Sequence, residues 1–143
     1  MKSFSTETDI NAPPEVVWSV LTDGSTFTDW DPGMISLDGT IGPDQPLTIY
    51  AEVSPDRAFK VKVSTFEPNK KMVWSSGMPL GLFKGARTFN LSPNGSGGTH
   101  FSMNETFSGP LLFLIGSTIP DLKPIFDDFA AALKQRAEAA VTT

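Results

Sequence analysis

The clearest pattern in the chain is a two-residue alternation of apolar and polar side chains. It appears first near the N-terminus, where Phe4, Thr6, Thr8 and Ile10 share one side. Such a period places successive side chains on opposite faces of a strand. Later alternating stretches are separated by short turns rich in Pro, Gly, Asn and Asp. The pattern predicts strands over residues 2–11, 35–41, 47–53, 57–66, 72–76, 83–91 and 99–107.

Two other segments repeat every three or four residues, as amphipathic helices do. The first begins near Pro13–Glu15 and ends at Thr22–Gly24, with Val16, Val17, Val20 and Leu21 as its stripe. The second begins at about Asp121, and its apolar positions are Leu122, Ile125, Phe126, Phe129, Leu133 and Ala137. Strands joined by short turns pair as an antiparallel meander. With helices only near its ends, the chain is predicted to be one α+β domain over residues 1–143.

Several stretches resemble a known group of proteins when they are taken together. They are residues 10–18 and 21–23, Trp30–Pro32, Trp74, Gly85, the hairpin from Phe89–Pro93 to Gly98–Thr99, Glu105–Gly109, and Leu133–Glu138. The chain resembles the START-like, or Bet v 1-like (SRPBCC), superfamily, and within it the polyketide cyclase/dehydrase and lipid-transport group. The resemblance covers essentially the whole chain.

The resemblance implies a helix-grip fold. In this fold a curved seven-stranded antiparallel sheet surrounds a long C-terminal helix, and an apolar cavity lies between them. It implies much less about function, because the superfamily includes lipid and hormone binders, aromatase/cyclases, toxin-sequestering proteins and chaperone activators.

Composition excludes several kinds of site. The chain has no cysteine and one histidine, and its carboxylates lack metal-ligand spacing, so we expect neither a metal nor a cofactor. The net charge is −5 and the basic residues are scattered, which argues against nucleic acid. The N-terminus lacks a signal-like apolar run, and Leu111–Ile115 is far shorter than the ~20 residues of a spanning helix. We expect a soluble cytoplasmic protein without stable membrane insertion; the pattern leaves the oligomeric state open.

Two charged residues fall on otherwise apolar strand faces. Arg87 shares its face with Phe89 and Leu91, and Glu105 shares its face with Phe101 and Met103. Pairing Leu91 with Phe101 across the 92–98 turn brings Arg87 opposite Glu105, because a strand register must keep facing parity. Trp74 on the preceding strand extends the row. We therefore predict a Trp74–Arg87–Glu105 row on the concave face of the sheet.

This row has three possible roles. The two charges form a structural pair with Trp74 stacked on the guanidinium, they anchor a ligand in an apolar pocket, or Glu105 acts as a general base with Arg87 supporting an oxyanion. His100 has the opposite parity and is expected at the surface. Trp30 is expected to anchor under the sheet, with Asp31–Pro32 shaping the loop rather than acting in catalysis.

The favoured function is binding of a small, largely apolar, lipid- or polyketide-like molecule between sheet and helix. Cyclisation or dehydration of a polyketide-like substrate by Glu105 and Arg87, and a protein-interaction role like that of chaperone activators, are the alternatives. Residues 111–114 (Leu111, Leu112, Phe113 and Leu114) are interpreted as a lid or, alternatively, as packed core. The predicted ligand-binding residues are Phe59, Val61, Val63, Trp74, Arg87, Phe89, Phe101, Met103, Glu105, Phe126, Phe129 and Leu133.

Overall fold

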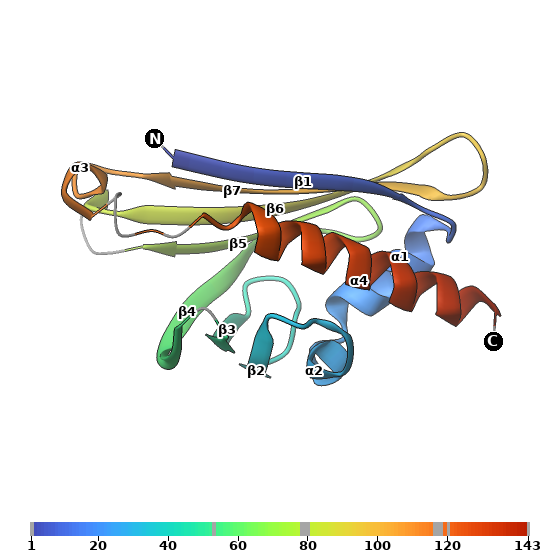
Figure 1. Ribbon diagram of the computed structural model, residues 1–143, viewed down its shortest axis with the longest axis horizontal. Helices are drawn as coiled ribbons and strands as arrows, with labels where there is room; N and C mark the ends of the chain where they lie inside the picture. The colour runs from blue at the N-terminus through green and yellow to red at the C-terminus, as the bar shows by residue number, and fades with distance from the viewer. Residues whose placement is uncertain (1, 53, 78–80, 116–118, 120, 143) are drawn as a thin grey trace.

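The computed structural model describes residues 2–52, 54–77, 81–115, 119 and 121–142. Its strands form one seven-stranded antiparallel sheet in the order β1-β7-β6-β5-β4-β3-β2 (Figure 1). This confirms the predicted α+β class and the antiparallel meander. The strands are β1 (Lys2–Ile10), β2 (Met34–Asp38), β3 (Pro46–Ala51), β4 (Ser54–Glu67), β5 (Lys71–Gly77), β6 (Lys84–Pro93) and β7 (Thr99–Ser108).

The helices lie near the two ends of the chain, as their periodicity predicts. The C-terminal helix α4 runs beside β1 on the concave side of the curled sheet (Figure 1). It covers the part of the sheet next to α1 and leaves the opposite end, near α3, uncovered. The helical segments are α1 (Pro14–Thr22), the short 3-10 turn η1 (Gly24–Thr26), α2 (Phe27–Trp30), α3 (Leu112–Ile115) and α4 (Lys123–Thr142). None of the helices in the described ranges is long and apolar enough to cross a membrane.

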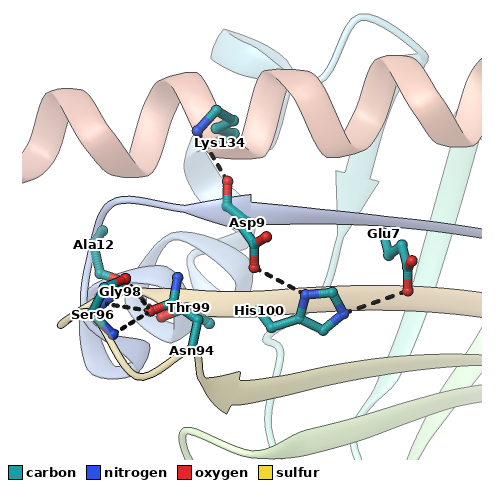
Figure 2. Close-up of polar contacts among 9 residues, drawn as sticks. All are labelled: Glu7, Asp9, Ala12, Asn94, Ser96, Gly98, Thr99, His100 and Lys134. Atoms are coloured by element: carbon teal, nitrogen blue, oxygen red, sulfur yellow. Dashed lines mark hydrogen bonds and ion pairs between the residues drawn. The ribbon is translucent and has the colours of Figure 1, made fainter.

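Side chains of α4 hold the helix against the edge strand β1. The hydroxyl of Thr6 donates to Oδ1 of Asp127 at 2.7 Å. The backbone N–H of Asn11 donates to Oε2 of Glu138 at 2.9 Å. Figure 2 shows Lys134 of α4 reaching the backbone carbonyl of Asp9, a contact of 2.9 Å. These contacts fix where the apolar stripe of α4 meets the sheet.

The β6–β7 turn carries its own polar scaffold (Figure 2). Oδ1 of Asn94 accepts hydrogen bonds from the backbone N–H groups of Ser96 and Gly98, at 3.0 and 3.2 Å. The buried hydroxyl of Thr99 donates to the carbonyl of Ala12 at 2.7 Å. An asparagine that accepts from its own turn is a common way to close such a loop. The turn therefore has a defined shape despite its glycines, and it sets the β6–β7 register.

Strand β4 departs from simple alternation where it pairs with β5. The β4–β5 register shifts between Val63 and Thr65, so that Val63 pairs with Trp74 while Phe66 pairs with Met72. The shift brings Phe66 to the inner face, where its ring lies 5.2 Å from that of Trp18. Alternation alone assigns Phe66 to the outer face of β4. A bulge inserts one extra residue and thereby exchanges the faces beyond it.

Candidate functional site

The structure confirms the predicted row of residues across the sheet. Arg87 of β6 is paired with Trp74 of β5 on one side and with Glu105 of β7 on the other. The row continues to Val63 in β4 and to Phe4 in β1. Leu91 pairs with Phe101, as the register argument requires. The two charged residues therefore share the concave face of the sheet.

Arg87 and Glu105 form an ion pair that keeps some access to solvent. Nε of Arg87 donates to Oε1 of Glu105 at 3.1 Å, and the two side chains are 28% and 15% exposed. The guanidinium carbon lies 4.9 Å from the ring centroid of Phe126 on α4. The sequence suggested Trp74 as the stacking ring; the ring observed there is Phe126, because α4 covers this part of the row. The pair thus lies where the covering helix begins.

Five aromatic rings beside the pair form a closed circuit. Ring-to-ring distances around it are 4.9, 5.3, 6.2, 4.9 and 6.1 Å, in the order Phe27, Trp30, Phe129, Phe89, Trp74 and back to Phe27. The rings come from α2, α4, β6 and β5. Such edge and tilted contacts stabilise aromatic cores beyond simple burial. Trp30 is thus the anchor that its sequence position predicted.

Both indoles of this circuit have unsatisfied donors. Nε1 of Trp30 and Nε1 of Trp74 are buried and make no hydrogen bond within the described residues. A buried N–H without a partner costs free energy, and most native structures avoid it. The guanidinium of Arg87 adds further N–H groups, since the described contacts use only its Nε in a hydrogen bond. The aromatic circuit and the adjoining Arg87 therefore carry several N–H donors without a described acceptor.

Asp31 brings a second carboxyl close to the row. It follows α2, and its Oδ1 accepts a hydrogen bond from the backbone N–H of Gly33 at 3.0 Å. This bond confirms the loop-shaping role predicted for Asp31. Burial raises the pKa of Asp31, against the opposing effects of the Gly33 bond and of the positive charge on Arg87. The sequence analysis did not predict this shift in the pKa of Asp31. The available signal was the position of the carboxyl directly after Trp30, which was expected to be an anchor.

Most residues predicted to line a cavity are instead packed against one another. Phe59 and Val61 are partly buried at the margin of the core. Phe126, Phe129 and Leu133 of α4 are buried together with the sheet residues of the predicted set, so α4 packs closely on this part of the sheet. The fully packed members of the predicted set are Val63, Trp74, Phe89, Phe101, Met103, Phe126, Phe129 and Leu133.

The hollows found in the structure lie elsewhere. One, of about 400 Å³, lies at Ser75, Ser76, Gly77 and Lys84. The other, of about 460 Å³, is mainly polar and is lined by residues of β1, β7 and β6 together with the first residue of α4. Its lining residues are Ser5, Thr6, Glu7, Asn90, Ser102, Met103, Asn104 and Lys123. Neither of these two hollows includes Arg87 or Glu105, and Met103 is the one predicted ligand-binding residue that lines either of them.

The segment interpreted as a lid forms the short helix α3. Phe113 is 93% exposed, so it is not packed as core. Leu111 and Leu112 are half-buried. The backbone N–H of Leu111 donates to the carbonyl of Leu82 at 2.9 Å, which ties the segment to the start of β6. The side chain of Leu114 lies outside the described residues.

The histidine lies on the face of the sheet opposite to the row. His100 lies on the outer face, between Oδ1 of Asp9 at 3.0 Å and Oε2 of Glu7 at 3.4 Å, which confirms its predicted surface position (Figure 2). Its hydrogen bond to Asp9 raises the pKa of His100. The described residues contain no cluster of three or more His, Asp or Glu able to hold a metal ion.

Comparison with known proteins adds a family and a fold. The sequence model of the family described as polyketide cyclase / dehydrase and lipid transport matches residues 1–138. No curated protein matches the chain. Similar solved structures include the Zhui aromatase/cyclase of a Streptomyces species, with a TM-score of 0.74 and 12% identity over 98% of this chain and 95% of that one.

Two further structures have comparable similarity. A START superfamily protein from Mycobacterium smegmatis has a TM-score of 0.70 and 18% identity, over 96% of this chain and 98% of that one. A truncated norcoclaurine synthase from Thalictrum flavum has a TM-score of 0.69 and 16% identity, over 94% and 92%. At these identities the structural likeness concerns the fold.

Proposed function

Because the chain belongs to the polyketide cyclase/dehydrase and lipid transport family, whose members typically bind hydrophobic ligands, we propose that it binds a small, largely apolar molecule on the concave face of its sheet. The site is the Arg87–Glu105 pair with its apolar neighbours. The observation that carries the proposal is a polar pair that keeps solvent access on an otherwise apolar face. Ligand sites are usually apolar surfaces with a few placed polar groups.

The donors at the site define the ligand further. The buried indole N–H groups of Trp30 and Trp74 lack partners within the described residues, and the guanidinium of Arg87 has N–H groups to spare. A ligand that carries an oxygen acceptor, such as a ketone or a phenol, would satisfy these donors. Polyketide-like molecules combine rings with such oxygens, and fatty acids combine a chain with them. The proposed ligand is therefore apolar with at least one acceptor oxygen.

Access to this ligand site comes from the uncovered end of the concave face. The aromatic circuit is closed by Phe129 of α4, whose ring lies 5.3 Å from Trp30 and 6.2 Å from Phe89. Phe59 and Val61 are partly buried and lie on the inner face of β4. A ligand that enters beside the ion pair would pack against such residues, and Phe129 would have to shift for it to reach the indoles.

Native mass spectrometry of the purified protein tests the proposal. The wild type is expected to retain a co-purified small molecule, and a variant in which both Arg87 and Glu105 are replaced by Leu is expected to lose it. The double variant removes the pair together, so no single charge is left without its partner. The proposal fails if the wild type carries nothing and no apolar probe with an acceptor oxygen raises its melting temperature, since bound ligand stabilises the folded state.

A second candidate function, cyclisation or dehydration of a polyketide-like substrate, is favoured by Asp31. Its pKa is raised by burial, so near its pKa it can hold a proton beside the cation of Arg87, as a general acid does. The test is exchange of deuterium from solvent into the carbon next to the carbonyl of a bound diketone, followed by NMR. Exchange lost in Asp31→Asn or Glu105→Gln with binding retained supports chemistry; exchange equal to that without protein excludes it.

A further inference from the structure

Exposed apolar side chains gather at the end of the molecule that α4 leaves uncovered. Phe113 of α3 is 93% exposed and Leu82 is 39% exposed. Leu111 and Leu112 are half-buried beside them. The Leu111 N–H bond to the Leu82 carbonyl joins the two segments at 2.9 Å. Most large apolar side chains of the described residues are buried, so an almost fully exposed phenylalanine requires an explanation.

The backbone holds these side chains in place. Gly109 has a φ of +109°, and a Cβ added there would lie 2.6 Å from the carbonyl oxygen of Leu82. The position therefore requires glycine, both for its conformation and for the close approach of the two backbones. The turn at Gly109 fixes the direction in which α3 leaves β7. Phe113 is thus presented to the outside by an ordered turn.

The chain segment that carries this end differs in charge from the whole chain. The protein carries 16 acidic residues against 11 basic ones. Residues 71–120 nevertheless contain a single acidic residue, Glu105, which is paired with Arg87. Lys84 opens β6 two residues after Leu82, and Lys2 opens β1 opposite Phe107. Strand pairing and sequence position therefore place two lysines near the exposed apolar residues, and the Lys2 ammonium also donates to the Ile119 carbonyl at 3.3 Å.

We propose that this end docks on the surface of an anionic lipid bilayer. The docking surface, called the α3 tip, consists of Leu82, Leu111, Leu112 and Phe113 with Lys2 and Lys84. Phe113 would enter the boundary between headgroups and acyl chains while the lysines meet lipid phosphates. Such a combination of apolar and basic groups is what interfacial binding needs. The binding is peripheral, and it does not depend on the ligand proposed above.

The remaining exposed apolar residues show what distinguishes the α3 tip. Ile35 is 39% exposed and Val141 is 48% exposed. Each lies near carboxylates, since Asp38 is on the same strand as Ile35 and Glu138 is three residues before Val141. Scattered single residues of this kind are ordinary surface features. Ile35 and Val141 therefore serve as matched controls.

Co-flotation with vesicles tests the docking. The wild type is expected to float with vesicles of phosphatidylglycerol and phosphatidylcholine, and less with phosphatidylcholine alone or at high salt. Phe113→Ser should weaken binding about tenfold, since it removes the main apolar contact. Lys84→Gln should weaken it about fivefold. Val141→Ser and Ile35→Ser should leave it unchanged.

Circular dichroism melting accompanies each variant, and Phe113→Ser should melt like the wild type because its side chain is exposed. The proposal is overturned if the wild type fails to float with the anionic vesicles, or if Phe113→Ser floats as well as the wild type. Binding that is equal with and without phosphatidylglycerol also contradicts it, because the lysines would then have no part. A wild type that instead pairs with itself or with another protein through Phe113, and ignores vesicles, assigns the tip to a protein partner and overturns the lipid proposal.

Discussion

Arg87 and Glu105 face each other across β6 and β7, with Nε and Oε1 3.1 Å apart, on the apolar side of the sheet. Both side chains keep part of their surface open to solvent. An ion pair in such a place loses less hydration than one in a sealed core, and it gains from the ring of Phe126 above it. The pair therefore keeps part of its hydration while it is held on an apolar face.

Removing one partner of this pair should destabilise the fold more than removing both. Arg87→Leu and Glu105→Leu are each expected to lower the free energy of unfolding by about 2–3 kcal/mol, below the roughly 3–5 kcal/mol of a fully buried pair. The double variant should recover much of that loss. Urea unfolding of the four proteins gives the coupling energy.

Lys62 and Asp44 provide the matched control. They are 3.9 Å apart and more than half exposed, so the same cycle on them should give a coupling below about 0.5 kcal/mol. Equal coupling energies in the two cycles would mean that the concave face does not strengthen the Arg87–Glu105 pair.

The aromatic circuit should depend on Phe129. Its ring contacts those of Trp30, Phe89 and Phe101, so Phe129→Ala leaves a hole in the core and should cost about 3–4 kcal/mol of unfolding free energy. Phe113→Ala is the control, because that ring is exposed and its loss should change stability by less than about 0.5 kcal/mol. A Phe129→Ala variant as stable as the wild type would show that α4 does not depend on this contact.

His100 should make stability depend on pH. The charged groups that face it are Asp9 and Glu7 of β1, and Lys134 of α4 lies on the backbone oxygen of Asp9. Because the hydrogen bond to Asp9 raises the pKa of His100 in the folded state, its stabilisation is complete below the ordinary pKa of about 6.5 and is lost as pH rises through the folded value.

The comparison of wild type with His100→Gln measures this effect. The wild type should be more stable at acidic pH, by no more than about 1 kcal/mol for an exposed pair, and the difference should disappear at alkaline pH. A difference that grows as pH rises would have the wrong sign for this assignment.

The charged form of Asp31 should lower the stability of the fold, whereas the charged form of His100 should raise it. Burial raises its pKa above the ordinary value of 3.8, so the folded state binds its proton more tightly than the unfolded chain does. Stability therefore falls as pH rises from 3.8 through the folded pKa, and this cost remains at neutral pH. Asp31→Asn should melt higher than the wild type at pH ~7, while the gain should vanish in strong acid.

Gly33→Pro tests the contribution of the hydrogen bond within this loop, because it removes the backbone N–H that donates to Oδ1 of Asp31. A lower melting temperature for Asp31→Asn at neutral pH would mean that the hydrogen bond to Gly33 outweighs the burial of charge.

The sequence was sufficient for the row because a strand alternates strictly and a turn fixes its register. Parity restricted the register to two-residue steps, and pairing Leu91 with Phe101 then placed Arg87 opposite Glu105; the observed register confirms both pairings. The same reasoning failed at Phe66, where a bulge after Val63 exchanges the two faces. A bulge has no sequence signature there, because Ser64 and Thr65 suit either arrangement.

Contacts between elements that are distant in the sequence also could not be predicted from it. Strand parity pointed Trp74 inward and helical periodicity pointed Phe126 inward, yet neither pattern could tell which ring lies over the Arg87 guanidinium. Nor could either pattern foresee that α4 would pack closely on this part of the sheet, or that two indole N–H groups would be left without partners among the described residues. These features depend on how closely a helix approaches the sheet, which no local pattern records. The ligand roles of the predicted site residues stay predictions.

The proposed ligand chemistry is tested most directly with two matched probes, acetylnaphthalene and ethylnaphthalene, which have similar size and differ in one carbonyl oxygen. Titration calorimetry on the wild type should give about tenfold tighter binding of the ketone, as expected for a hydrogen bond from a charged donor. Arg87→Leu with Glu105→Leu should reduce the preference for the ketone, because only the indole donors remain. Equal binding of the two probes by the wild type, or binding of neither, would contradict the assignment of Arg87 and the indoles as donors to a ligand.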